Sequence, residues 1–163
     1  MFRRILVPID GSPTSSRGLD EAIDLASDQK AKMCLVHVVD EMVVTTGADG
    51  MVYMPPNYVD DFVKALRNAG QKLLARAEAK VRKRGIDVDT VLVETVGRRV
   101  ADLIVKQAKK WDADVIVLGT HGRRGLTRLV MGSDAEMVLR ETQLPVLLVR
   151  SPVRARARRA RHA

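Results

Sequence analysis

The sequence predicts a doubly wound α/β domain, in which a five-stranded parallel sheet carries helices on both faces. Short, continuously apolar runs that are typical of buried strands alternate along the chain with amphipathic stretches of helical period. The order is β-α-β-α-β-α-β-α-β, and right-handed crossovers between parallel strands then produce three layers. With 163 residues, the chain is long enough for one domain with a full hydrophobic core.

The first strand, helix and second strand follow directly on one another. Residues 3–9 are a branched apolar run that predicts a buried strand, and it ends at turn residues 10–12, Asp-Gly-Ser. Residues 14–27 predict a helix, because apolar side chains recur there near helical spacing. Residues 32–39 predict a second buried strand.

A long loop precedes the longest helix. Residues 40–57 contain two glycines and two adjacent prolines, and loops of this length in compact domains are commonly functional or disordered. The helix is expected to open at residue 57 or 58 and to end before Gly85. Apolar residues at helical spacing predict its buried face: Phe62, Leu66, Leu73, Ala77 and Val81.

The second half of the chain repeats the alternation of strand and helix. Three further apolar runs predict strands over residues 88–94, 114–119 and 145–150. Between them we expect a helix that follows Gly97 and ends near Trp111, and a short helix over 133–141. A loop rich in glycine and arginine, residues 120–131, separates the fourth strand from the short helix.

The positive charge is concentrated at the carboxyl terminus. Of the formal net charge of +8, five charges are arginines in residues 151–163, which contain no acid, so residues 1–150 carry +3. We therefore expect a folded domain over residues 1–150 and a disordered basic tail over 151–163. The tail is interpreted as a solvated charge run, with nonspecific contact to nucleic acid or an anionic membrane left open.

Composition excludes several other classes. The single cysteine, Cys34, excludes a disulfide framework and a zinc site built from several cysteines. No apolar run reaches about 18 residues, and the first run is too short for a signal peptide, so we expect a soluble cytoplasmic protein. Cys34 and His37 lie within the second strand and are expected to be core residues.

The segment after the fourth strand carries the predicted chemistry. Ligands of doubly wound sheets bind beyond the carboxyl ends of the strands, where the strand order reverses. Residues 119–136 place four glycines there, and the last, Gly132, opens a helix. Glycine backbone and helix amino termini present N–H groups to anions, and nearby arginines add donors. The segment therefore predicts a phosphate site, although neither a P-loop nor a dinucleotide fingerprint occurs.

Four blocks of the chain resemble the universal stress protein family. Gly119-x2-Gly122-x9-Gly132-Ser133 is similar to the G-x2-G-x9-G-[S/T] signature of its ATP-binding branch. ILVPIDGS, LVHVVDE and PVLLVR resemble the family's first, second and fifth strands, so the resemblance covers residues 3–150. It implies the strand order 3-2-1-4-5, ATP as the ligand, and a homodimer formed through the last strand, Val146 to Val149.

The resemblance also implies which residues bind the nucleotide. Pro8, Ile9 and Asp10 would line the ribose and adenine, with Asp10 accepting hydrogen bonds from ribose hydroxyls, and Val38 would lie against adenine. The ribose and phosphates would contact the glycine loop and the helix after it: Gly119, His121, Gly122, Arg123, Gly132, Ser133, Asp134 and Ala135. Asp10 has a plainer alternative as the cap of the first helix. The Asp134 carboxylate is expected to face solvent or to help hold Mg²⁺ beside the phosphates.

The sequence favours a regulatory protein over an enzyme. No pair of carboxylates or general base is placed for hydrolysis, so we assign no catalytic residue and no resident metal site. The predicted function is an ATP-binding stress-response protein whose nucleotide changes its conformation or partners through loops 40–57 and 123–131. Two alternatives stay open: a slow ATPase or a protein that phosphorylates itself on Ser133, and a dimeric adaptor with a vestigial pocket.

Overall fold

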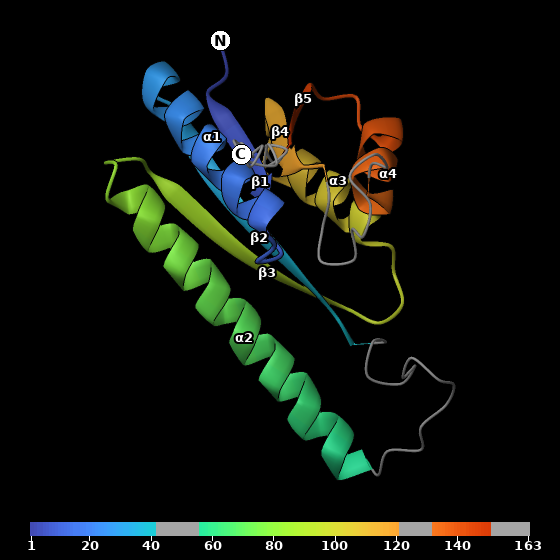
Figure 1. The fold of residues 1–163 in the computed structure, drawn as a ribbon. Helices are drawn as coiled ribbons and strands as arrows, with labels where there is room; N and C mark the ends of the chain where they lie inside the picture. Colours follow the sequence, from blue (N-terminus) through green and yellow to red (C-terminus); the bar gives the residue numbers. More distant parts are fainter. Residues whose placement is uncertain (42–55, 121–131, 151–163) are drawn as a thin grey trace, which may run out of the picture.

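The structure is a computed structural model that describes residues 1–41, 56–120 and 132–150 (Figure 1). Its five parallel strands form one sheet in the order β3-β2-β1-β4-β5, which confirms the predicted fold. The strands are β1 (Arg4–Pro8), β2 (Lys32–Asp40), β3 (Val88–Thr95), β4 (Val115–Gly119) and β5 (Val146–Val149). The helices are α1 (Pro13–Gln29), α2 (Pro56–Arg82), α3 (Val100–Lys110) and α4 (Ser133–Glu141).

Each predicted element is present, with bounds that differ by a few residues for identifiable reasons. Prolines occupy the first positions of α1 and α2, because a proline at a helix start loses no hydrogen bond. Gly97 leads into α3 as expected: it takes a left-handed conformation with φ of 69° in the turn, and the helix begins at Val100.

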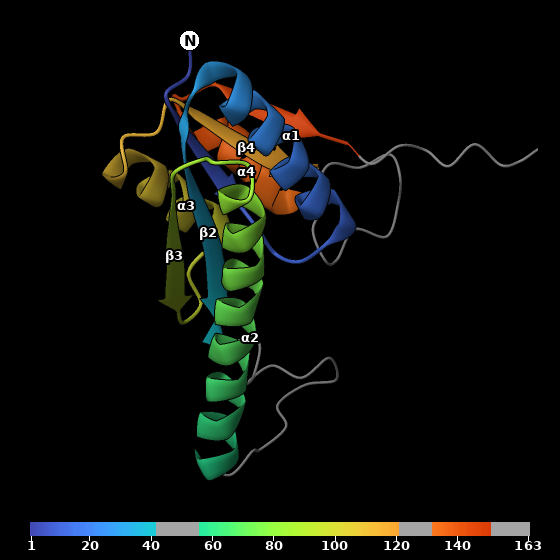
Figure 2. The ribbon, with the colours of Figure 1, turned by 90° about the vertical axis from the view of Figure 1, so that its left-hand side faces the viewer.

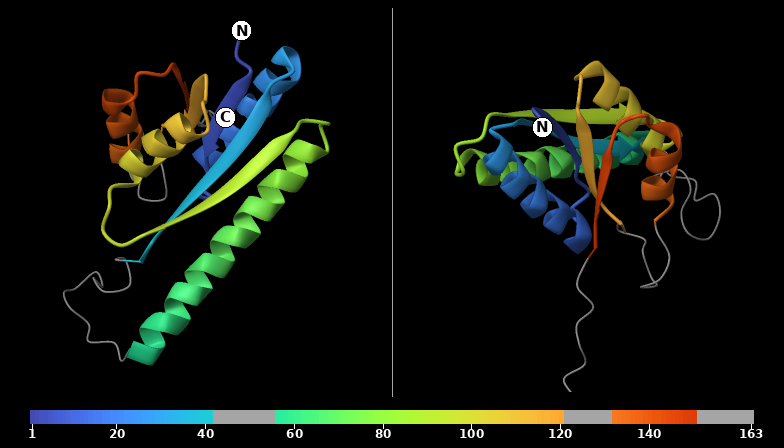
Figure 3. Two further views of the ribbon diagram at one scale, coloured as in Figure 1. Left: turned by 180° about the vertical axis from the view of Figure 1, so that it is seen from behind. Right: turned by 90° about the horizontal axis from the view of Figure 1, so that it is seen from above.

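Helices cover both faces of the sheet and produce two hydrophobic cores. Figure 3 shows α1 and α2 on one side of the strands and α3 and α4 on the other. Alternate residues of β1 enter the two cores: Ile5 and Val7 pack with α1 and α2, whereas Leu6 packs with α3 and α4. The central strands are therefore buried on both faces, as a parallel sheet requires.

The strand order reverses between β1 and β4. The chain leaves β1 through α1 toward β2 and β3, and α3 then carries it back across the sheet to β4. Helices and loops diverge at this point, so the carboxyl ends of β1 and β4 border the crevice in which doubly wound sheets bind their ligands.

The predicted buried face of α2 is correct only in its second half. Ala77 and Val81 are buried, but Phe62 keeps 43% of its surface exposed. Figure 2 shows the reason: the amino-terminal part of α2 runs past the ends of β2 and β3, so no sheet lies beneath it. Among the described residues, no helix combines the length and apolar composition that a membrane crossing needs.

A polar cluster fastens the far end of α3 to the amino ends of the strands. The Trp111 indole N–H donates to Asp89 Oδ2 over 2.8 Å, and Lys32 Nζ lies 3.2 Å from the same oxygen. The Trp111 hydrogen bond, and secondarily Lys32, hold the pKa of Asp89 below its ordinary value. The Arg4 guanidinium lies over the Trp111 ring, 4.2 Å from its centroid. α3 is thereby fixed relative to β1 and β3.

Candidate functional site

The turn after β1 is built by hydrogen bonds from its own side chains. Ser12, not Asp10, caps α1: its side chain accepts the Ser15 N–H over 3.1 Å. Asp10 Oδ1 instead accepts the Ser12 N–H over 2.8 Å, and Gly11 between them takes a φ of 80°. The alternative that Asp10 caps the first helix is therefore wrong, because Asp10 accepts a hydrogen bond within the turn and Ser12 caps the start of α1.

A buried histidine holds the same turn from the neighbouring strand. His37 Nδ1 lies 2.7 Å from the Ile9 carbonyl oxygen, and a carbonyl only accepts, so Nδ1 carries the proton in this contact. α2 packs directly over the ring, because a Cβ on Gly70 would lie 2.7 Å from His37 Cδ2. The core role predicted for His37 is confirmed, and the ring also positions Ile9 and Asp10.

At the end of β4, Gly119 allows α1 to approach the sheet. A Cβ at this position would lie 2.8 Å from the Thr14 carbonyl carbon and 3.0 Å from the Ser15 nitrogen. Both are backbone atoms of the first turn of α1, and they cannot rotate away as a side-chain end can. Close packing therefore explains why residue 119 is a glycine. The family resemblance implies only that Gly119 contacts the nucleotide.

Two backbone hydrogen bonds bring the start of α4 to the end of β4. The Gly132 N–H donates to the Thr120 carbonyl over 2.8 Å, and the Thr120 N–H donates to the Val149 carbonyl over 2.9 Å. The backbone before and after residues 121–131 therefore meets at one point. The first-turn N–H groups of α4 have no acceptor within the helix and carry the positive end of its dipole. They are consequently held at the carboxyl edge of the sheet.

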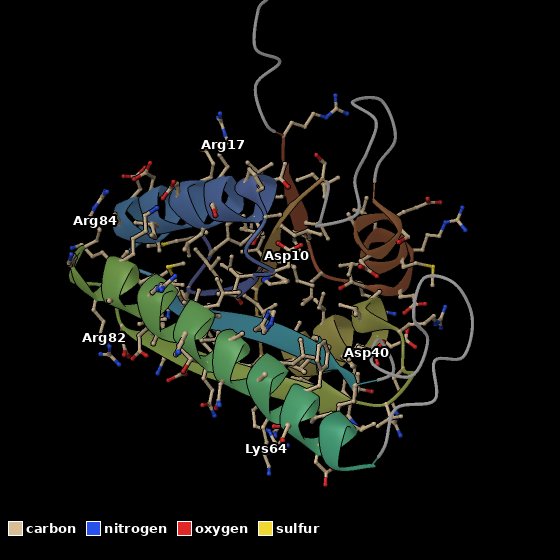
Figure 4. All side chains as sticks on the ribbon, turned by 60° about the horizontal axis from the view of Figure 1, so that its bottom comes forward. Asp10, Arg17, Asp40, Lys64, Arg82 and Arg84 are labelled. Atoms are coloured by element: carbon tan, nitrogen blue, oxygen red, sulfur yellow. The ribbon has the colours of Figure 1, made fainter. Side chains whose placement is uncertain are left out.

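A continuous chain of contacts joins the two halves of this edge. The Asp10 N–H donates to Ser15 Oγ over 3.1 Å, Ser15 lies against Gly119, and Thr120 next to it binds Gly132. The turn after β1 and the amino terminus of α4 thus border the same place, where a doubly wound sheet is expected to have its ligand crevice. In Figure 4, Asp10 lies near the middle of the molecule where α1 begins, whereas Asp40 lies at the carboxyl end of β2.

The other predicted nucleotide contacts are distributed around this crevice. Val38 pairs with Val93 near the end of β2 and is half-buried on the face that α3 covers. Ser133 and Asp134 are exposed in the first turn of α4, while the Ala135 side chain is buried beneath it. Exposure of Asp134 agrees with the expectation that it faces solvent. Three predicted contacts fall outside the described residues: His121, Gly122 and Arg123.

Sequence reasoning missed the residues that support the crevice from below. Ser12, Thr14 and Ser15 are buried polar residues in the first turn of α1, and Thr120 is buried at the end of β4. The Ser12-Pro13 pair is a recognisable helix start and was an available signal. Nothing in the local sequence around Thr120 marks it, because its partners come from β5 and α4.

These features define a class of protein: a doubly wound α/β domain in which the turn after β1 and the amino terminus of α4 are joined at the topological switch point. Comparison with known proteins identifies the family. The model of the universal stress protein family matches residues 1–150. Universal stress protein YxiE of Bacillus subtilis is 35% identical over 151 residues, which cover 92% of this chain and 100% of that protein. The chain therefore belongs to the universal stress protein family.

Further relatives and solved structures agree. Universal stress protein MJ0531 of Methanocaldococcus jannaschii is 31% identical, over 93% of this chain and 84% of its own. The crystal structure of a family member from Burkholderia pseudomallei is 34% identical, with a TM-score of 0.68 over 89% of this chain and 93% of that one.

Two solved structures of the family contain nucleotides. A universal stress protein from Archaeoglobus fulgidus, in complex with dAMP, has a TM-score of 0.60 and 24% identity, covering 90% of this chain and 97% of that one. A universal stress protein in complex with cAMP has the same TM-score and identity, covering 91% of this chain and 97% of that one. At this identity the likeness shows the fold.

Proposed function

We propose that this chain is an ATP-binding stress-response protein whose bound nucleotide alters its conformation or its partners. The observation that carries the proposal is the crevice, in which Asp10 and the amino terminus of α4 are linked through Ser15, Gly119 and Thr120. A helix amino terminus suits phosphates, and a carboxylate across the crevice suits ribose hydroxyls. The nucleotide complexes of two relatives support the same ligand class.

The nucleotide would span the crevice from α4 to β2. Backbone N–H groups of Ser133, Asp134 and Ala135, with the Ser133 hydroxyl, would bind the phosphates at the start of α4. Asp10 would accept hydrogen bonds from the ribose, with Pro8 and Ile9 beside it, and Val38 would lie against the adenine. Gly132 suits this arrangement because it caps α4 without a side chain that would occupy the anion position.

Asp134 introduces a repulsion that a cation would relieve. Its carboxylate is exposed in the first turn of α4, where the helix dipole favours negative charge and where the phosphates would bind. Two anions at one helix end repel each other, and a divalent cation bridging them removes the repulsion. We therefore propose that ATP binds as its Mg²⁺ complex and that Asp134 faces the cation.

The proposal is tested by nucleotide binding to the purified chain and to Asp10→Asn. Asparagine keeps the Oδ1 that accepts the Ser12 N–H, so the turn and the melting temperature are expected to be unchanged. Loss of the charge weakens the ribose hydrogen bonds, and ATP affinity in titration calorimetry is expected to fall about tenfold. Asp28→Asn, at the exposed far end of α1, is the charge-matched control and is expected to bind as the unmodified chain does.

A second experiment, mass spectrometry, separates the switch from its alternatives. Mass spectrometry of small molecules released from the denatured protein is expected to find an adenine nucleotide. ADP or phosphorylated Ser133 accumulating after loading with ATP would indicate a slow ATPase or a self-phosphorylating protein. If Asp10→Asn binds ATP as tightly as the unmodified chain, Asp10 does not contact the ribose.

We further propose that two copies pair through β5. Val146–Val149 is an edge strand of the described sheet, and Leu147 keeps 41% of its surface exposed there. Leu147→Asp places a charge on this edge and is expected to convert the dimer to a monomer in sedimentation velocity. Phe62→Asp, on the exposed start of α2, is the control and is expected to leave the dimer intact. A monomeric unmodified chain would contradict the proposal.

A further inference from the structure

A groove of about 740 Å³ lies between α3 and β3. Its floor contains Val91 and Val93 of β3, and Leu103 of α3 forms part of one wall. Val96, with 68% of its surface exposed, continues the apolar floor beyond the end of β3. None of the residues that we assign to the nucleotide lines this groove.

The groove exists because only one face of β3 is covered by a helix. Leu92 faces α2 and packs into the core on that side. Val91 and Val93 face the opposite side, where both remain half-exposed, whereas Val36, the β2 partner of Val91, is buried beneath α3. Strands of parallel sheets are normally covered on both faces, so this face of β3 lacks one layer.

The rim of the groove is positively charged. Arg98, Lys106 and Lys110 line it, and none of them forms an ion pair with another described residue. Lys106 and Lys110 are one helical turn apart on α3, so their like charges repel each other. Of the two acids in the lining, Glu94 is paired with Arg67 of α2 over 2.5 Å, and the other is Glu41 at one end.

We propose that this groove binds an acidic amphipathic helix of a partner protein, which supplies the missing layer beside α3. Its apolar stripe would cover Val91, Val93 and Val96, and carboxylates one turn apart on its flank would pair with Lys106 and Lys110. α3 has 11 residues and is about 16 Å long, which matches about three turns of a partner helix. Cations distributed along the groove favour a ligand with several charges over a lipid with a single head group.

The proposal is tested with a fluorescein-labelled peptide of about 18 residues that carries leucines on one helical face and glutamates one turn apart beside it. We expect its anisotropy to rise on titration with the full chain. Lys106→Glu/Lys110→Glu is expected to weaken binding at least about tenfold, as loss of two groove cations should. Two probes check specificity: a scrambled peptide of the same composition, and a peptide with lysines in place of the glutamates.

The matched control is Lys72→Glu/Lys109→Glu. Both lysines are exposed, neither lines the groove, and each double variant changes the net charge equally. Each also removes one cation from the last turn of α3, so the loss of helix-dipole stabilisation is the same. The control is expected to bind the acidic peptide as the unmodified chain does. The Lys106→Glu/Lys110→Glu variant is expected to bind the lysine peptide instead, which would show that the charges pair directly.

The contribution of the apolar floor is tested by Val91→Thr/Val93→Thr, which keeps the branched shape and adds a hydroxyl at each position. This double variant is also expected to bind the acidic peptide more weakly than the unmodified chain does. Peptide binding is expected to be the same in Asp10→Asn, so the groove and the nucleotide site can fail independently.

Several outcomes would overturn the proposal. The first is that the scrambled peptide binds as tightly as the acidic peptide. The second is that the Lys72→Glu/Lys109→Glu control loses as much affinity as Lys106→Glu/Lys110→Glu. The third is that the unmodified chain does not bind the acidic peptide. Dissociation of a dimer by Lys106→Glu/Lys110→Glu would instead identify a second copy as the occupant. Tighter binding of a single-stranded oligonucleotide that depends on the same two lysines would identify a nucleic-acid groove.

Discussion

Gly119→Ala is expected to destabilise the fold by about 3 kcal/mol, because the new methyl group would overlap backbone atoms that have no room to move. The added Cβ would lie 2.8 Å from the Thr14 carbonyl carbon and 2.9 Å from its oxygen. Relief requires α1 to shift away from β4, which opens the core that both share. For a domain of this size the melting temperature is expected to fall by about 10 °C, measured by thermal unfolding followed by circular dichroism.

Gly18→Ala is the comparison, since Gly18 faces Gly119 across the same contact. There the added Cβ would lie 3.3 Å from the Gly119 nitrogen, and alanine gains about 1 kcal/mol of helix propensity over glycine. Its effect is therefore expected to be much smaller. A Gly119→Ala variant as stable as the unmodified chain would show that α1 and β4 are not in this close contact.

Ser133→Pro is expected to weaken ATP binding by tenfold to about a hundredfold while leaving the fold intact. Ser133 is the first residue of α4, a position where proline fits because the N–H has no acceptor in the helix. Gly132 before it has φ of −62° and ψ of 144°, the extended conformation that a residue before proline prefers. The substitution therefore removes a backbone donor and a hydroxyl from the proposed phosphate site without breaking the helix.

Ser133→Ala separates the two losses, because it removes the hydroxyl alone. Its effect on ATP affinity in titration calorimetry is expected to lie between those of the unmodified chain and of Ser133→Pro. Adenosine, which has no phosphate, is expected to bind the three proteins equally. Equal ATP affinity for all three proteins would show that the phosphates do not contact the start of α4.

The strand order was predicted from the family resemblance, whereas the sequence of elements came from hydrophobic pattern alone. Runs such as residues 115–119 are apolar throughout because helices cover both faces of the strand, and that pattern is visible without a structure. The exposed start of α2 was not predictable in this way. Phe62 continues the helical apolar pattern of α2, and only the ends of β2 and β3 decide that nothing covers it.

The candidate site was predictable where glycine spacing marks it and not where tertiary packing supports it. Gly132 and Ser133 follow from the glycine motif and the helix after it. His37 was predicted as a core residue, but its hydrogen bond to Ile9 depends on the register between β1 and β2. The groove beside β3 had no signal in the sequence, because Val91 and Val93 look like the other valines of buried strands.

Titration calorimetry of Mg·ATP into the chain, after bound nucleotide has been removed, tests whether ATP binds between Asp10 and α4. We expect saturable binding of one ATP per chain and a melting temperature that rises with ATP concentration, since a ligand that binds only the folded state stabilises it. No heat of binding, together with an unchanged melting temperature at about 1 mM ATP, would contradict nucleotide binding at the crevice between Asp10 and α4.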